Sequence, residues 1–319
     1  DLLSGCVCSS RKLRLELDEV KMKFWKRHSS KPKLCILGDH SKFHSGCKAV
    51  MRTLWRLANE KGWQIVRNCE SCDALLVNGE GSMHDGSKRF HEKMNSLKQA
   101  VTHGKPAYLV NTVWQDNPHD YDDLLQQLSG IFVREVLSQK ELLEKHGVQS
   151  TTFPDASFFA PLARWTIPHH FHDRPAVSDF LVEPKRINGR RNIFQRLDHM
   201  FVEAEPLPFC RWSWGKNIAS LRTARYLITG RHHAVYAACV ARIPFVASEG
   251  NTHKIEGLVA SAGADLRVAE HPSQISEIIE ENLSKPEEYL RLFDWIDRHD
   301  IGEMMPSPDE IWGQQVIAA

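Results

Sequence analysis

Arg231, His232 and His233 lie where a predicted strand ends and a predicted helix begins, and Lys254 follows the next strand in the same way. In open α/β sheets, anionic ligands bind at the carboxyl ends of the strands, against the unpaired N–H groups and the positive dipole end of a helix. Cationic side chains at the same place strengthen that attraction. The C-terminal half of the chain is therefore predicted to bind a phosphate or carboxylate. The sequence leaves open which of the two histidines faces the ligand.

Acidic side chains follow predicted strands in the N-terminal half. Glu80 stands between two glycines, which permit a tight turn and a close ligand approach, and Asp155 follows the last strand of this half. We interpret Glu80 as the acid/base acting on an acceptor hydroxyl and Asp155 as a nucleophile or charge stabiliser. The alternatives are a helix cap for Glu80 and a turn residue for Asp155. Arg134 either contacts the donor or pairs with Glu135 or Asp155.

An acceptor is expected to lie beside Glu80. Polar residues near the same predicted strand ends are the candidates to contact it. They are Asn78, His84, Asp85 and Asn111.

Strand and helix patterns alternate from residue 32 onward, which predicts parallel sheets with helices on both faces. A stretch rich in proline and histidine at 161–176 is typical of a linker. We therefore predict an α/β fold with two Rossmann-like βα domains facing a cleft, a GT-B-like architecture. The predicted parts are a basic helical segment at 1–31, an acceptor-side domain at 32–160, the linker at 161–176, and a donor-binding domain with C-terminal helices at 177–319. Strands of the second domain are expected at 179–182, 200–203, 226–229, 245–248 and 266–268.

Composition limits the function. The 319 residues carry a net charge of +1, which argues against nucleic acid as a partner, and no apolar run approaches the ~20 residues of a membrane span. Residues 9–31 form either a membrane-surface helix or a packed helix. Cys35 and Cys239 read as reduced core thiols, and Cys69-x-x-Cys72 lacks a second pair at zinc spacing. No metal is expected, including at the histidines of the linker.

The order of these motifs resembles the polysaccharide pyruvyl transferase family, over roughly residues 32–285. The motifs that carry the resemblance are N-G-E-G-S-M-H, L-V-N-T-V-W-Q-D-N, F-V-R-E, F-P-D-A-S-F, G-R-H-H-A and the Asn251-Thr252-x-Lys254 loop. The resemblance implies a bacterial GT-B-like enzyme that transfers a pyruvyl group from phosphoenolpyruvate to a surface-polysaccharide sugar as a ketal. It also implies that Arg231 and His233 handle the donor and that Arg134, His232, Asn251, Thr252 and Lys254 contribute to its site.

One residue departs from the family pattern, because Glu80 stands where a Gly-Gly-Gly turn is usual. Together with Asp155 it resembles the paired carboxylates of the retaining β-Kdo glycosyltransferases. The alternative function is thus a glycosyltransferase that uses a nucleotide-activated sugar such as CMP-Kdo, and a third is a scaffold without activity. For the transferase we expect no cofactor, a sugar or lipid-linked oligosaccharide as acceptor, and a cytoplasmic location at the inner face of the membrane. The sequence does not predict the oligomeric state.

Overall fold

The structure is a computed structural model that describes residues 31–162, 170–181, 194–196 and 200–311. The basic helical segment predicted for 1–31, with its membrane contact at 9–31, lies outside these residues, apart from Lys31. Part of the predicted linker does so as well, including His169. Among the described helices, none combines the length and the apolar character that crossing a membrane requires.

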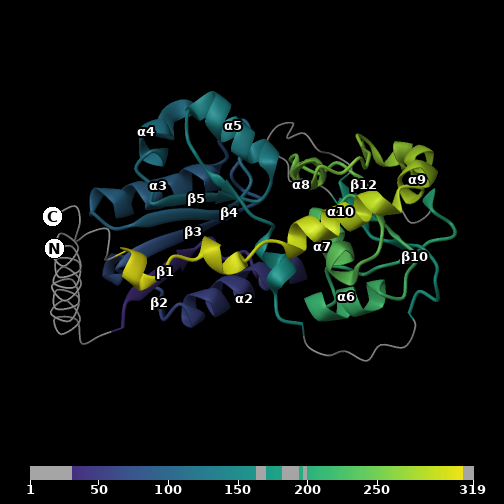
Figure 1. Ribbon diagram of the computed structural model, residues 1–319, viewed down its shortest axis with the longest axis horizontal. Helices are drawn as coiled ribbons and strands as arrows, with labels where there is room; N and C mark the ends of the chain where they lie inside the picture. Colours follow the sequence, from purple (N-terminus) through teal and green to yellow (C-terminus); the bar gives the residue numbers. More distant parts are fainter. Residues whose placement is uncertain (1–30, 163–169, 182–193, 197–199, 312–319) are drawn as a thin grey trace, which may run out of the picture.

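The first domain is built on a parallel sheet with the strand order β2-β1-β3-β4-β5-β6 (Figure 1). Its strands are β1 (Lys33–Leu37), β2 (Gln64–Val66), β3 (Ala74–Glu80), β4 (Ala107–Thr112), β5 (Gly130–Val133) and β6 (Thr151–Thr152). Every residue of β3 and β4 is buried. Strands covered on both faces read as continuous apolar runs, which is why the sequence locates them well.

Helices cover both faces of this sheet. Residues of β3 alternate between two cores: Leu75 and Val77 pack with α3 (Lys88–Thr102), whereas Leu76 packs with α2 (Ser45–Glu60). The short α4 (Asp122–Leu125) and α5 (Val136–His146) complete the domain. This alternation follows from the two-residue period of a strand, and it fixes which strand ends face the second domain.

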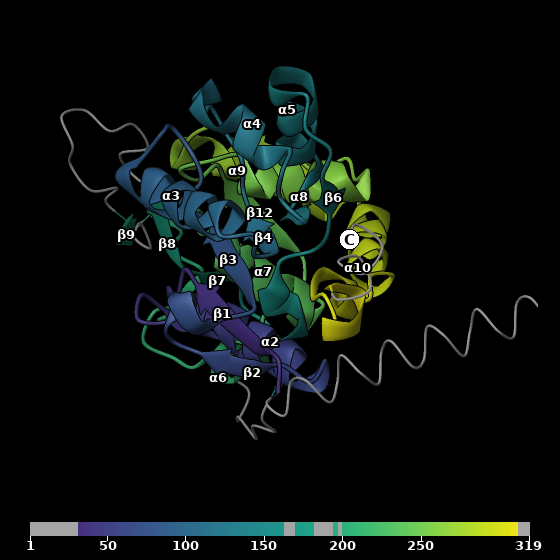
Figure 2. The same ribbon diagram turned by 90° about the vertical axis from the view of Figure 1, so that its left-hand side faces the viewer.

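The second domain has a parallel sheet with the order β10-β7-β11-β12-β13. Its strands are β7 (Ala176–Val177), β10 (Glu205–Pro206), β11 (Leu227–Thr229), β12 (Phe245–Ser248) and β13 (Val268–Ala269). Its helices are α6 (Trp214–Leu221), α7 (His232–Ala241), α8 (Lys254–Ala262), α9 (Ile275–Leu283) and α10 (Pro286–Asp297). The predicted α/β class with two parallel βα domains is confirmed. Figure 2 shows the two domains one behind the other.

Of the strand predictions for the second domain, the one at 179–182 is confirmed only in part and the one at 200–203 is wrong. Residues 179–181 form β8 (Asp179–Leu181), which pairs antiparallel with β9 (Phe194–Arg196) outside the main sheet. No strand forms at 200–203, where the chain turns with a hydrogen bond from the amide of Ala204 to the carbonyl of Phe201. The apolar pattern there is misleading because the side chain of Val202 is 90% exposed. The expected strand at 266–268 is shifted to β13.

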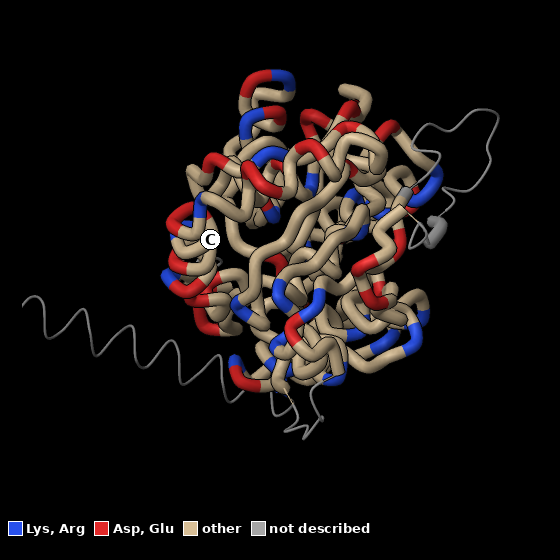
Figure 3. Tube along the Cα trace, turned by 90° about the vertical axis from the view of Figure 1, so that its right-hand side faces the viewer, with Lys and Arg blue, Asp and Glu red and all other residues tan. Residues whose placement is uncertain are grey.

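The end of the described chain returns to the first domain (Figure 1). Ile301, Met304 and Met305 pack with α2 and the first sheet, and the indole of Trp63 donates a 2.7 Å hydrogen bond to the carbonyl of Pro306. Residues 301–311 thus complete the core of the first domain, although the sequence assigned them to the second. Acidic and basic residues are interspersed over the outer side of the second domain, in keeping with the net charge of +1 (Figure 3).

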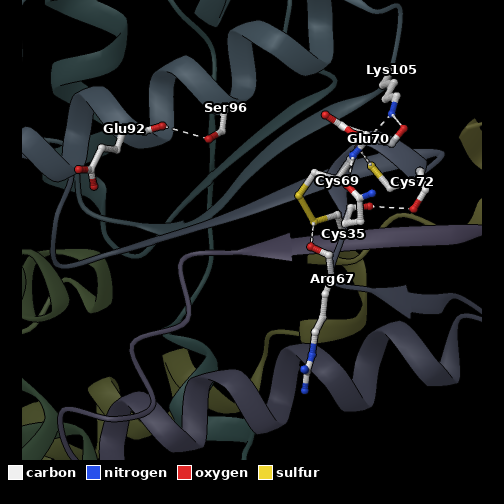
Figure 4. The surroundings of a disulfide bond; sticks show 10 residues. Cys35, Arg67, Cys69, Glu70, Cys72, Glu92, Ser96 and Lys105 are labelled. Carbon is white, nitrogen blue, oxygen red and sulfur yellow. Dashed lines mark hydrogen bonds between the residues drawn. A yellow bond between two sulfur atoms is a disulfide. The ribbon is translucent and has the colours of Figure 1, made fainter.

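The cysteine prediction requires one correction. Cys35 of β1 and Cys69, which opens the short helix η1 (Cys69–Ser71), are joined in a disulfide (Figure 4). Cys35 is therefore not a reduced thiol. A sequence separation of 34 residues hides the pair in the sequence, and the parallel pairing of β1 with β2 brings the two cysteines together. Cys239 is a free, buried thiol, as predicted.

Candidate anion-binding site between the domains

The carboxyl edge of the first sheet holds three of the predicted site residues. Glu80 ends β3, Asn111 lies near the end of β4, and Arg134 directly follows β5. All three are at most 2% exposed. Glu80 and Asn111 have φ angles of 47° and 51°, a left-handed conformation that is costly for residues other than glycine. Strain of this kind is concentrated at binding and catalytic sites.

Arg134 is held by Asp155, the N-cap of the short helix η3 (Ala156–Phe159). Its Nη1 donates a 2.7 Å hydrogen bond to Asp155 Oδ2, and both side chains are almost completely buried. The other carboxylate oxygen, Oδ1, accepts a hydrogen bond from the amide of Ser157. Nε and Nη2 of Arg134 are buried without a hydrogen-bond partner. Two of the three guanidinium nitrogens therefore remain available to a ligand. The predicted pairing with Asp155 uses only the third nitrogen, Nη1.

Glu80 lies in a buried network at the end of β3. The side-chain nitrogen Nδ2 of Asn78 lies 3.4 Å from Glu80 Oε2, and Nδ1 of His40 lies 3.4 Å from the same oxygen. Burial raises the pKa of the Glu80 carboxyl, although a hydrogen bond from Cys47 and the charge of Arg134 oppose that rise. Burial and nearby cations lower the pKa of His40 to about 3, so the imidazole is neutral near pH 7. Glu80 therefore faces a neutral partner and tends to hold a proton.

Lys93 is a site residue that the sequence reading missed. Its ammonium donates hydrogen bonds of 2.6 and 2.7 Å to the carbonyls of Asn78 and Gly79, and one of 2.7 Å to Ser82 Oγ. Lys93 thereby ties the turn that carries Glu80. A signal was present, because Lys93 falls within the apolar stripe of α3 between Phe90 and Leu97. A lysine at a core-facing helical position needs buried acceptors.

Arg231 is bound within its own domain. As the N-cap of α7 it donates a 2.8 Å hydrogen bond from Nε to Asp179 Oδ1, and Nη2 contacts Oδ2 of the same carboxylate. Asp179 follows β7 and was not among the predicted site residues. Its fork-to-fork pair with Arg231 fixes the direction of the guanidinium and compensates its charge.

His233, rather than His232, approaches the first domain. His233 Nε2 lies 3.9 Å from Asp155 Oδ1, and its ring centroid lies 4.8 Å from that of His44. Its side chain is completely buried, and both ring nitrogens lack a hydrogen-bond partner. His232 packs its ring between His233 and Tyr236. Burial and the neighbouring cationic groups hold the pKa of His233 well below its ordinary value, so it is neutral in the free protein.

Lys254 brings a second buried cation from the other domain. Its Nζ donates a 2.8 Å hydrogen bond to Asn251 Oδ1, and a Cβ added to Gly81 would lie 3.4 Å from the same nitrogen. The Lys254 ammonium therefore lies next to the turn that follows Glu80. Burial and the charge of Arg134 lower the pKa of Lys254 to about 7. Thr252 is buried beside it, with a hydroxyl that has no hydrogen-bond partner.

The acceptor candidates divide into two groups. Asn78 and Asn111 join in the interior, where the amide of Asn111 donates a 3.2 Å hydrogen bond to Asn78 Oδ1. Asn111 also accepts a 2.9 Å hydrogen bond from the amide of Ala156, which anchors the Asp155 turn. His84 lies at the domain boundary, with Nε2 3.5 Å from the amide of Asn251. Asp85 is exposed, and its carboxylate pairs with Nδ1 of His84 at 2.7 Å.

A second contact between the domains is built on Glu135. Its carboxylate accepts hydrogen bonds from the amides of Leu137 and Ser138 and so caps α5. His253 Nε2 lies 3.2 Å from both the Glu135 carboxylate and Ser138 Oγ. A Cβ on Gly257 of α8 would collide with the Glu135 carboxylate. These contacts hold the Lys254 loop against the first domain.

Arg134, Glu80 and Asp155 of one domain thus meet Lys254 and His233 of the other. The fold and this buried set of charges define a two-domain α/β protein with a candidate anion-binding site between its domains. The chain matches the model of the polysaccharide pyruvyl transferase family over residues 10–250, and it belongs to that family. Membership makes it a transferase of polysaccharide metabolism.

Solved structures resemble the chain only distantly. A functionally uncharacterised protein of Klebsiella pneumoniae is 14% identical, with a TM-score of 0.45, and the match covers 76% of this chain and 92% of that one. The S. aureus MnaA structure with UDP is 8% identical, with a TM-score of 0.49 and coverages of 86% and 94%. A UDP-GlcNAc 2-epimerase of Neisseria meningitidis, bound to UDP-GlcNAc, is 8% identical, with a TM-score of 0.47 and coverages of 90% and 100%. No curated protein matches the sequence.

Proposed function

We propose that this protein transfers a pyruvyl group from phosphoenolpyruvate to two hydroxyls of a sugar acceptor, forming a ketal and releasing phosphate. One observation carries the proposal: the fully buried Arg134 guanidinium keeps two unpartnered nitrogens beside Lys254. A buried, partly unsatisfied cation is costly unless a ligand supplies the missing acceptors. A small donor with a carboxylate and a phosphate would satisfy both cations.

The reaction requires proton transfers that the neighbouring groups can provide. Both acceptor hydroxyls bond to the central carbon of the donor, its methylene carbon gains one proton and becomes a methyl group, and phosphate leaves with the other proton. Glu80 starts protonated in this scheme, gives its proton to the methylene carbon, and recovers one from an acceptor hydroxyl. His233 starts neutral, so it first takes a hydroxyl proton and then passes it to the departing phosphate. A protonated Glu80 also avoids repelling an anionic donor.

The nucleotide-sugar alternative has weaker support. A retaining glycosyltransferase would need Asp155 free to attack the sugar, but Arg134 binds one oxygen of that carboxylate and the amide of Ser157 binds the other. These bonds lower the nucleophilicity of Asp155 and suit it to position Arg134. No contact in the described part of the chain favours a nucleoside.

The test combines phosphoenolpyruvate with a panel of sugars and lipid-linked oligosaccharides, and it measures phosphate release and the ketal mass increment. We expect turnover that is abolished in Arg134→Lys, which keeps the charge but loses the forked donors. The matched control is Arg242→Lys, because Arg242 forms an exposed pair with Asp297 and should tolerate the change. Sugar transfer from a CMP donor, with phosphoenolpyruvate inert, would overturn the proposal.

A further inference from the structure

Three side chains at the domain boundary carry the donor atoms that zinc prefers. They are His44, the N-cap of α2; Cys47 in the first turn of α2; and His233 in the first turn of α7. One ligand atom from each lies within 4.8 Å of the other two. Two of the residues come from the first domain and one from the second. Cys69-x-x-Cys72 was considered as a possible zinc motif from the sequence, but the pair His44-x-x-Cys47 was not.

We propose that His44, Cys47 and His233 form a binding site for a zinc-class cation that bridges the two domains. The spacing of the ligand atoms supports it. Zn–S bonds of about 2.3 Å and Zn–N bonds of about 2.0–2.1 Å in a tetrahedron place sulfur and nitrogen roughly 3.5 Å apart. Cys47 Sγ and His44 Nε2 lie 3.4 Å apart. A small movement of the His233 ring towards His44 and Cys47 would give the cation three protein ligands. The fourth position of the tetrahedron is then left for water or a carboxylate.

His233 supplies the independent observation. Its side chain has no exposed surface, and neither ring nitrogen has a hydrogen-bond partner. Buried imidazoles nearly always satisfy at least one nitrogen, so this ring lacks a ligand. The His233 ring can pack directly on α2 because residue 46 is glycine. A Cβ at this position would lie 2.5 Å from the ring. A side chain at position 46 would separate His233 from His44 and Cys47.

The surrounding charges accommodate a cation. Arg134 and Arg231 are the nearest guanidinium groups, and each is already paired with a carboxylate. Metal binding displaces the thiol proton of Cys47 to solvent, so the metal and thiolate together carry one positive charge. Coordination through Nε2 places the proton of His44 on Nδ1, so the 3.4 Å capping contact from the Cys47 amide is lost, at a cost that metal binding has to exceed.

The site has a consequence for the proposed transferase. His233 cannot coordinate a metal and handle the departing phosphate at the same time. Metal loading and donor binding should therefore exclude each other, and a bound ion would hold α2 against α7. This consequence depends on the proposed function, whereas the metal site itself does not.

The test uses Co²⁺ titration of the purified chain, followed by absorption spectroscopy. Thiolate ligation gives a near-ultraviolet charge-transfer band, which we expect to saturate at one Co²⁺ per chain and to disappear in Cys47→Ser and His233→Ala. Cys239→Ser is the matched control, since Cys239 is equally buried and free in α7, and it should keep the band. A band that survives in Cys47→Ser, or no band in the wild-type chain, would overturn the site.

The charge-transfer band distinguishes the Cys47 site from a second group of possible metal ligands. His119, Asp122 and His146 also lie within metal-binding reach of one another, but they contain no sulfur. Binding there alone would give Co²⁺ uptake without the charge-transfer band, would be lost in His119→Ala, and would count against the proposal. If phosphoenolpyruvate displaces Co²⁺ from the Cys47 site, both proposals gain support. A Co²⁺ site that ignores phosphoenolpyruvate, together with no ketal product, would refute the transferase proposal alone.

Discussion

Replacement of Lys254 by Met should stabilise the protein in the absence of donor and abolish the stabilisation that the donor gives. The Lys254 ammonium is buried at the domain boundary and donates a 2.8 Å hydrogen bond to Asn251. Burial lowers its pKa from 10.5 to about 7 in the folded state. Burial of Lys254 therefore lowers the free energy of unfolding at every pH at which this side chain is protonated in the unfolded chain. Met has a similar volume and no charge to bury.

The size and sign of the effect follow from proton linkage. The difference between a pKa of 10.5 and one of about 7 corresponds to a penalty on the order of 5 kcal/mol. The penalty is fully present below pH 7, and it shrinks as the pH rises from about 7 towards 10.5, because the unfolded chain then loses the proton as well. At pH 9 about 2 kcal/mol remains. Loss of the bond to Asn251 offsets roughly 1 kcal/mol.

The assay is urea unfolding of wild type and Lys254→Met at pH 6, 7, 8 and 9, with and without phosphoenolpyruvate. We expect the variant to be more stable by several kcal/mol at pH 6 and by much less at pH 9. Lys140→Met removes an exposed lysine of α5 and serves as the control with little effect. A variant that is less stable than wild type at every pH would refute the reasoning. If the donor stabilised the variant as much as wild type, Lys254 would not contact the donor.

Other substitutions test the elements around the site. Lys93→Met should lower turnover, because it strands the carbonyls of Asn78 and Gly79 in the turn that carries Glu80; unchanged turnover would contradict this. Gly46→Ala should cost about 1–3 kcal/mol and prevent Co²⁺ coordination by His233, whereas Gly250→Ala, with only ordinary contacts, should do neither. Leu54→Ala, at a fully buried position of α2, should lower the unfolding free energy by about 2–5 kcal/mol without changing the KM for donor; a raised KM would mean that the core of α2 positions the donor.

The sequence predicts the first domain better than the second, for a physical reason. The strands that end at Glu80 and Thr112 are buried on both faces and are separated by a helix with a clear apolar stripe. Sheet strands of two residues, such as β7, carry too little pattern to locate. The exposed Val202 then supplied an apolar signal with no strand behind it.

The candidate site shows the same limit. Residues in the segments that follow strands, such as Arg134 and Lys254, could be identified because parallel strand ends share one edge. Lys93, Asp179 and Cys47 reach the site from a helix face, a hairpin and a helix start, and their roles depend on contacts 11 or more residues away along the chain. The core-facing position of Lys93 in α3 is a local signal, but the partners of these side chains are not encoded locally. The disulfide of Cys35 was missed for the same reason.

The return of residues 301–311 to the first domain has a consequence for synthesis on the ribosome. Ile301, Met304 and Ile311 belong to the core formed by α2 and the first sheet, yet they emerge after the whole second domain. The first domain can collapse early, but part of its apolar surface around Trp63 stays uncovered until the second domain and residues 301–311 have been made. The domain that is made first is therefore finished last, and the nascent chain must keep that surface from aggregating in the interval.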